Sequence, residues 1–258
     1  MSTSPAVDML PGVRGRVRIE PSGKRVRAYL GGRLVADSTH PVLVWEQPSY
    51  PTYFFPLDDV RAGLTPTGEL SRSPSRGYGT VYDVQVTGAT APGAAIRYLD
   101  SPIEQLRDLV RLEWDAMSEW FEEDEIVYTH PRNPYTRVDI LPSSRHVRVE
   151  IDGVILADSR QPRLLFETGL PTRYYLPMTD VRMDLLRPSS TQSYCPYKGT
   201  ATYFTLETAG SIRPDVAWIY RTPLPESQKI AGLVSFYNER ADIFVDGILM
   251  VRPQGRVG

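Results

Sequence analysis

The residues best suited to chemistry lie in the stretch YCPYK at residues 194–198, where a thiol precedes an ammonium group by three residues. Thiolate is the reactive form of cysteine, and a nearby positive charge favours it. Glu167 supplies a carboxylate that is able to act as a general base. We therefore take Cys195, Glu167 and Lys198 as the candidate catalytic residues.

Aromatic residues in the same half of the chain suit a ligand-binding wall. A tyrosine presents an apolar ring and a hydroxyl that forms hydrogen bonds, so several of them can line an amphipathic pocket. Lys198 would then pair with a carboxylate or phosphate group of the ligand. The candidate ligand-binding residues are Tyr174, Tyr175, Asp180, Tyr203, Trp218 and Arg132.

Each of these residues also has a structural interpretation. A lone cysteine is usually a small, buried apolar residue. A glutamate at a strand end can satisfy loop amides, and an aspartate before a valine can cap a turn, which would explain Glu167 and Asp180. Arg132 belongs to a segment with two prolines that is typical of an extended linker docked on a neighbouring surface. Both interpretations stay open at this stage.

The chain contains an internal repeat. Residues 16–60 align without a gap on residues 137–181, and the identical pairs include Glu46 with Glu167 and Tyr53 with Tyr174. An ungapped match of this length indicates gene duplication. We expect two tandem domains, at residues 10–128 and 129–251.

The two copies differ around the candidate site. The stretch at residues 74–79 of the first copy (PSRGYG) lacks the cysteine and the lysine of residues 194–198. This difference favours a site in the second copy, with the first copy kept for support or for another ligand.

Turn and periodicity signals predict the elements of each copy. Strand-like runs flank Gly31-Gly32 in the first copy and Asp152-Gly153 in the second, which are typical of type I′ hairpins. Apolar residues at helical spacing predict a helix over residues 101–122, with its counterpart over residues 225–240. The sequence therefore predicts a mainly β (α+β) fold, in which each copy is a small β-barrel or sheet domain with one C-terminal helix.

Composition narrows the class of protein. The chain of 258 residues is 41% hydrophobic and 23% charged, as in soluble globular proteins. Its formal charge of -2 offers no basic surplus for nucleic acid. No apolar run approaches the roughly 18 residues of a membrane helix, and no secretory signal is recognisable. With one cysteine and isolated His40 and His146, we expect no disulfide, metal site or cofactor, and a cytoplasmic location.

Several stretches of the second copy resemble the DUF427 family. They are RHVRV at 145–149, ADS at 157–159, FETGLPTRYYLP at 166–177, CPYKGTATY at 195–203 and FYNER at 236–240. The resemblance covers nearly all of residues 130–250 and, more loosely, residues 16–128. It implies a mostly β domain of bacteria and fungi whose function is unknown.

The function expected from these observations is binding of an unknown small molecule, with or without catalysis, in a polar and aromatic pocket of the second copy. The alternative is a non-catalytic interaction or scaffold protein. A family label hints at distant kinship with nucleotidyltransferases, but the sequence shows no paired Asp-x-Asp metal motif or Gly-Ser loop for that chemistry.

Overall fold

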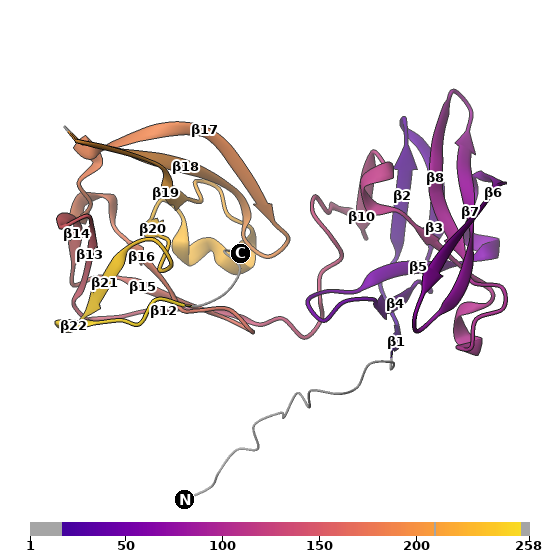
Figure 1. Cartoon of the computed structure of the whole chain (residues 1–258), viewed down its shortest axis with the longest axis horizontal. Coiled ribbons are helices and arrows are strands. Elements are labelled where there is room, and N and C mark those ends of the chain that lie inside the picture. Colours follow the sequence, from indigo (N-terminus) through magenta and orange to yellow (C-terminus); the bar gives the residue numbers. More distant parts are fainter. Residues whose placement is uncertain (1–16, 209, 254–258) are drawn as a thin grey trace, which may run out of the picture. The chain divides into compact units, whose positions relative to one another are not determined.

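The computed structural model describes residues 17–208 and 210–253, and the chain divides between Asn133 and Pro134 into two compact units. Within the described residues, each unit contains one seven-stranded and one four-stranded sheet, and neither closes into a barrel (Figure 1). The strand order is the same in both units once the numbering is shifted, so the predicted duplication and the mainly β fold are confirmed.

The first unit follows the order β1-β4-β5-β9-β8-β7-β6 in its large sheet and β11-β10-β2-β3 in its small sheet. The large sheet consists of β1 (Arg18–Pro21), β4 (Val42–Trp45), β5 (Thr52–Pro56), β9 (Leu109–Leu112), β8 (Ala89–Arg97), β7 (Gly77–Val86) and β6 (Gly63–Ser73). The small sheet consists of β11 (Glu125–Ile126), β10 (Glu119–Glu122), β2 (Val26–Leu30) and β3 (Arg33–Ser38). Short 3-10 turns are η1 (Leu57–Asp59), η2 (Glu104–Leu106) and η3 (Trp114–Ala116).

The second unit repeats this order as β12-β15-β16-β20-β19-β18-β17 and β14-β13-β21-β22. Its large sheet consists of β12 (Val138–Pro142), β15 (Arg163–Glu167), β16 (Arg173–Leu176), β20 (Val234–Phe236), β19 (Ser211–Ile219), β18 (Gly199–Thr208) and β17 (Leu186–Cys195). The small sheet consists of β14 (Val154–Ser159), β13 (Val147–Ile151), β21 (Asp242–Val245) and β22 (Ile248–Leu249). Its 3-10 turns are η4 (Met178–Asp180), η5 (Met183–Leu185) and η6 (Pro225–Ile230).

The two predicted hairpins are confirmed. Gly31 and Gly32 have φ of +55° and +72°, and Asp152 and Gly153 have φ of +51° and +76°. Positive φ at both central residues is the signature of the type I′ turn, whose twist matches that of the flanking strands. These turns fix the register of β2 with β3 and of β13 with β14.

Each unit has an apolar core between its two sheets and a second cluster on the outer face of the large sheet. In the second unit the inner core includes Val149 of β13, Leu176 of β16 and Phe236 of β20. The outer cluster includes Tyr175 and Trp218, and the fully buried Ile230 of η6 packs against them. The segment containing η6 thus covers the outer face, where the candidate residues gather.

The prediction of a helix at the C-terminal end of each copy is wrong. Residues 101–122 form η2, β9, η3 and β10, and residues 225–240 form η6 and β20. Val110 and Leu112 enter the inner core, whereas the intervening Arg111 contacts Glu46 on the other face. Pairing of β9 with both β5 and β8 satisfies its backbone groups, so tertiary pairing overrides the helical spacing. Among the described residues no helix has the length and apolarity to cross a bilayer.

Candidate functional site

The outer face of the large sheet in the second unit brings together most of the predicted site residues. Glu167 ends β15, Tyr175 lies on β16, and Cys195 ends β17. Tyr203 lies on β18, and Trp218 on β19. We call this set, together with Lys198 and Tyr220, the tyrosine cluster.

Lys198 forms an ion pair with Glu167 inside this cluster. Lys198 lies in the turn between β17 and β18. The next residue, Gly199, begins β18 and has a φ of +92°. Leu224 donates its backbone N–H to the Lys198 carbonyl at 3.2 Å, so the turn is held against the segment leading to η6. The Lys198 and Glu167 side chains are only 12% and 7% exposed. An ammonium has three donors, and Glu167 is its one hydrogen-bond acceptor within the described chain.

Hydroxyl groups of the tyrosines form a connected network. Trp218 donates its Nε1–H to the Tyr175 hydroxyl at 3.1 Å. The Tyr203 hydroxyl lies 2.7 Å from Ser193 Oγ and accepts a hydrogen bond from Tyr237 at 3.3 Å. Burial raises the pKa of Tyr175, and nearby Cys195 and Glu167 raise it further. The Tyr175 phenol therefore stays neutral near pH 7.

Two hydroxyls in the cluster have unused hydrogen-bonding capacity. Tyr220 is 5% exposed, and its hydroxyl forms no hydrogen bond within residues 17–208 and 210–253. Burial raises its pKa, and so do the neighbouring Tyr175 and Cys195. Ser235 lies between Tyr175 and Trp218 in the sheet, is fully buried, and likewise has no partner for Oγ there. Buried polar groups are normally satisfied, so such groups require an explanation.

A second ion pair borders the cluster and was missed by sequence reasoning. Both terminal guanidinium nitrogens of Arg173 donate to Glu239, at 2.7 and 2.9 Å. The guanidinium carbon lies 5.6 Å from the centroid of the Trp218 ring and 5.8 Å from that of Tyr237. Burial favours a higher pKa for Glu239, but the hydrogen bonds from Arg173 lower it below the usual range. The only sequence signal was that Arg173 and Glu239 both lie inside the stretches that resemble DUF427.

Two predicted residues of the second unit lie away from the cluster. Tyr174 points into the inner core, since neighbours along a strand face opposite sides of the sheet. Asp180 accepts a hydrogen bond from Ser159 Oγ at 2.6 Å and so ties η4 to the small sheet. This contact supports the structural interpretation of Asp180.

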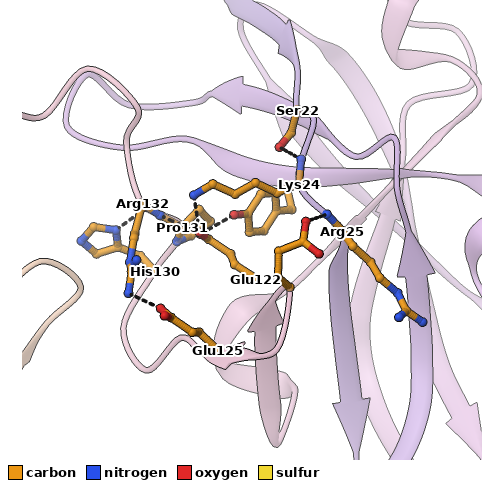
Figure 2. A network of polar contacts seen from close by, with 10 residues as sticks. Ser22, Lys24, Arg25, Glu122, Glu125, His130, Pro131 and Arg132 are labelled. Carbon is orange, nitrogen blue, oxygen red and sulfur yellow. Dashed lines mark hydrogen bonds and ion pairs between the residues drawn. The ribbon is translucent and has the colours of Figure 1, made fainter. Parts of the chain in front are cut away.

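Arg132 belongs to the first unit and lies beside a buried carboxylate there (Figure 2). Its backbone N–H donates to Glu122 Oε1 at 3.3 Å, and its guanidinium contacts Glu125 at 3.4 Å. Glu122, 5% exposed, also accepts hydrogen bonds from Lys24 at 2.5 Å and from the Tyr53 hydroxyl at 2.6 Å. Arg132 therefore helps to fasten the end of the first unit.

The comparison with known protein families agrees with the geometry. A family model described as a domain of unknown function (DUF427) matches residues 18–123 and again residues 139–247. The chain belongs to the DUF427 family. The two matches fall on the two units, so the protein carries two DUF427 domains in tandem. No curated protein matches the chain.

The hairpin register corrects the sequence alignment of the two DUF427 domains. Ser73 pairs with Gly77 where Cys195 pairs with Gly199, so Arg76 occupies the place of Lys198. Arg76 lies 3.0 Å from Glu46, the counterpart of Glu167. The first domain has thus kept a cation at this place, and the ion pair is common to both domains.

Tyr175, Tyr203 and Trp218, by contrast, are specific to the second DUF427 domain, whereas Tyr220 has a counterpart in Tyr98 of the first. The strand registers place Phe54, Val81 and Ile96 of the first domain where the second has Tyr175, Tyr203 and Trp218. The cysteine is also specific, because Ser73 stands in its place. Among the described residues, no group of three His, Cys, Asp or Glu side chains is arranged to hold a metal ion.

Proposed function

We propose that this DUF427 protein binds a small molecule at the tyrosine cluster of its second domain. The observation that supports this proposal is the unused hydrogen-bonding capacity of Lys198, Tyr220 and Ser235. Of these, the Ser235 hydroxyl is buried without a partner among the described residues, and burying an unsatisfied polar group costs about 1–3 kcal/mol. The first domain has Phe54, Val81 and Ile96 where the second has Tyr175, Tyr203 and Trp218, so the fold itself does not require polar groups at these three places.

The ligand that fits these groups carries a carboxylate or a phosphate. Glu167 holds the Lys198 ammonium in place, and the remaining donors of Lys198 bind oxygen atoms of the ligand. The rings of Tyr203 and Trp218 supply apolar contact area. Cys195 and Glu167 are the groups through which the same site would act on a bound ligand.

We also propose a bacterial, cytoplasmic setting for this binding, without nucleic acid or a membrane as partner. The single thiol of Cys195 suits a reducing compartment. The formal charge of -2 favours neither a nucleic acid nor an anionic membrane surface.

The experiment is a thermal-shift screen of small carboxylates and phosphate esters, followed by calorimetric titration of the compounds that stabilise the protein. Lys198→Met removes the ammonium, and Arg76→Met is the matched control at the equivalent place of the first domain. We expect saturable binding to the wild type and to Arg76→Met, and at least a tenfold loss of affinity in Lys198→Met. Equal binding to Lys198→Met and the wild type would contradict the proposal.

An interaction or scaffold role is the second candidate, and the ion pair shared by both domains favours it. In that case Glu167–Lys198 only anchors a turn, as Glu46–Arg76 does. Glu167→Gln and Lys198→Ala would then lower the melting temperature strongly, and no compound of the screen would bind. The proposed binding function instead predicts that ligand affinity changes more than stability.

A further inference from the structure

The first unit contains a cavity of about 250 Å³ that is separate from the tyrosine cluster. It lies where the connection from β4 to β5 meets η3 and residues 129–131. Its walls include Glu46, Tyr50, Thr52, Trp114, Asp115 and His130. A cavity of this size suits a small head group, since drug-sized ligands occupy about 300–1,000 Å³.

The duplicated fold shows what fills the equivalent place in the second unit. Val44 pairs with Thr52 as Leu165 pairs with Arg173, so Thr52 is the counterpart of Arg173. The turn after β9 has the bond from Ala116 N to the Glu113 carbonyl, and the turn after β20 has the bond from Arg240 N to the Tyr237 carbonyl.

These matching turns make Asp115 the counterpart of Glu239. The second unit therefore fills this place with the Arg173 guanidinium, bound to Glu239 at two points. In the first unit Thr52 is too short to reach Asp115. Asp115 is exposed at the cavity and forms no ion pair within the described part of the chain.

The charge balance of the cavity favours a positive ligand. Glu46 and Glu113 both contact Arg111, and Glu46 also contacts Arg76, so these four groups balance. The Asp115 carboxylate has no such partner among the described residues, so the cavity carries one negative charge in excess.

His130 adds no opposing positive charge near neutral pH. Burial lowers its pKa below the usual range. Its ring stacks on Tyr50 with the centroids 3.7 Å apart and closes one side of the cavity.

Aromatic rings line the same space. Trp114 stacks on Trp120 with their ring centroids 4.5 Å apart and their planes 5° apart, and both rings contribute to the wall. The electron-rich face of such a ring attracts a cation, and guanidinium groups stack well on tryptophan. The rings are not the counterparts of Trp218 and Tyr237, but they provide the same kind of surface.

We propose that the first-unit cavity binds the guanidinium group of a small organic cation. In the second unit the Arg173 side chain supplies the cation at this place. In the first unit a bound ligand would supply it. Asp115 would be its counter-ion, and Trp114 its stacking partner. This inference concerns a different domain from the proposed function and does not depend on it.

The experiment titrates the full chain with methylguanidine and follows tryptophan fluorescence and protein NMR shifts. Methylurea, a neutral molecule of the same shape, is the control ligand. We expect saturable binding of methylguanidine with shifts around Trp114, and at least tenfold weaker binding of methylurea. N-acetylarginine methylamide is titrated in parallel, and the tighter binder of the two guanidinium compounds identifies a free guanidine or an arginine side chain as the source.

Three variants locate the binding. Asp115→Asn should lower the affinity for methylguanidine by about fivefold, which is the effect of losing one exposed ion pair. Thr52→Arg should abolish binding, because its own guanidinium fills the cavity and pairs with Asp115. Asp58→Asn, an exposed aspartate of the same unit outside the cavity, should leave affinity unchanged. Equal affinity for methylurea, no saturable binding of methylguanidine, or unchanged affinity in both Asp115→Asn and Thr52→Arg would overturn the proposal.

Discussion

Arg173 and Glu239 form a two-point ion pair, with side chains only 12% and 10% exposed, at the place where the first unit has Thr52 and Asp115. This exchange turns a filled position into a cavity while the strands around it keep their order. The places of Tyr175, Tyr203 and Trp218 show the opposite change, because the first domain has apolar residues there. The two DUF427 domains have thus diverged in both directions on one scaffold.

The Arg173–Glu239 pair should be important for the stability of the second unit. Arg173→Ala leaves the largely buried Glu239 carboxylate without its ion-pair partner, which typically costs about 3 kcal/mol. Urea unfolding of the variant measures this loss. The variant leaves a space where the Arg173 guanidinium was. Methylguanidine can occupy this space and pair with Glu239, so it should restore part of the lost stability, whereas methylurea should not. An unfolding midpoint equal to that of the wild type would show that the pair contributes little.

Glu122 should make the first unit sensitive to acid. Burial favours a higher pKa, but hydrogen bonds from Lys24 and Tyr53 outweigh it and hold the folded pKa of Glu122 below its usual value. A lowered carboxyl pKa stabilises the fold fully above the unfolded value of about 4.3, and this stability disappears as the pH falls through the folded pKa. Unfolding free energies measured from pH 7 to pH 3 should therefore fall more steeply for the wild type than for Glu122→Gln. Parallel curves would contradict this role.

The hairpin turn of the second unit should tolerate only certain substitutions. Gly153 has a φ of +76°, a conformation that costs an alanine about 1 kcal/mol. Gly153→Ala should be destabilised by about that amount in thermal unfolding. Asp152→Gly relieves a residue with a φ of +51° but removes its exposed ion pair with Arg213, so this control should stay within about 1 kcal/mol of the wild type. Equal stability of Gly153→Ala would mean that the turn adapts.

Cys195 should be replaceable by serine in the fold, whereas bulk added to its thiol should block the site. Ser73 holds the equivalent place of the first domain in a buried position, so Cys195→Ser should change stability by about 1 kcal/mol or less. Alkylation of the half-buried thiol adds bulk beside the Lys198 turn and should block ligand binding. Mass spectrometry quantifies the modification, and the Cys195→Ser protein should keep its binding after the same treatment. Full binding by the alkylated wild type would place the thiol outside the site.

Local signals in the sequence predicted the features that depend on local geometry. The Gly-Gly and Asp-Gly pairs require positive φ at two successive residues, so they indicated both hairpins. The ungapped repeat indicated two similar halves. The tyrosine-containing stretches around Tyr175 and Tyr203 lie where the cluster forms, although only the structure shows their contacts.

Features that depend on pairing between distant strands were not predictable. The apolar spacing from Leu106 to Met117 resembles a helix, yet the sheet takes up residues 109–112 because both neighbouring strands offer hydrogen bonds. The period-two rule would have separated Tyr174 from Tyr175 once β16 was recognised as a strand. Arg76 was missed as the counterpart of Lys198 because its equivalence follows from the hairpin register and not from the linear alignment.

Native mass spectrometry of the freshly purified protein, compared with its denatured mass, tests the binding function most directly. The account predicts a small extra mass on the native wild type that disappears on denaturation. The same adduct should be present on Arg76→Ala and absent from Lys198→Ala. An unliganded native mass of the wild type, or an adduct that persists on Lys198→Ala, would contradict a ligand site at the tyrosine cluster.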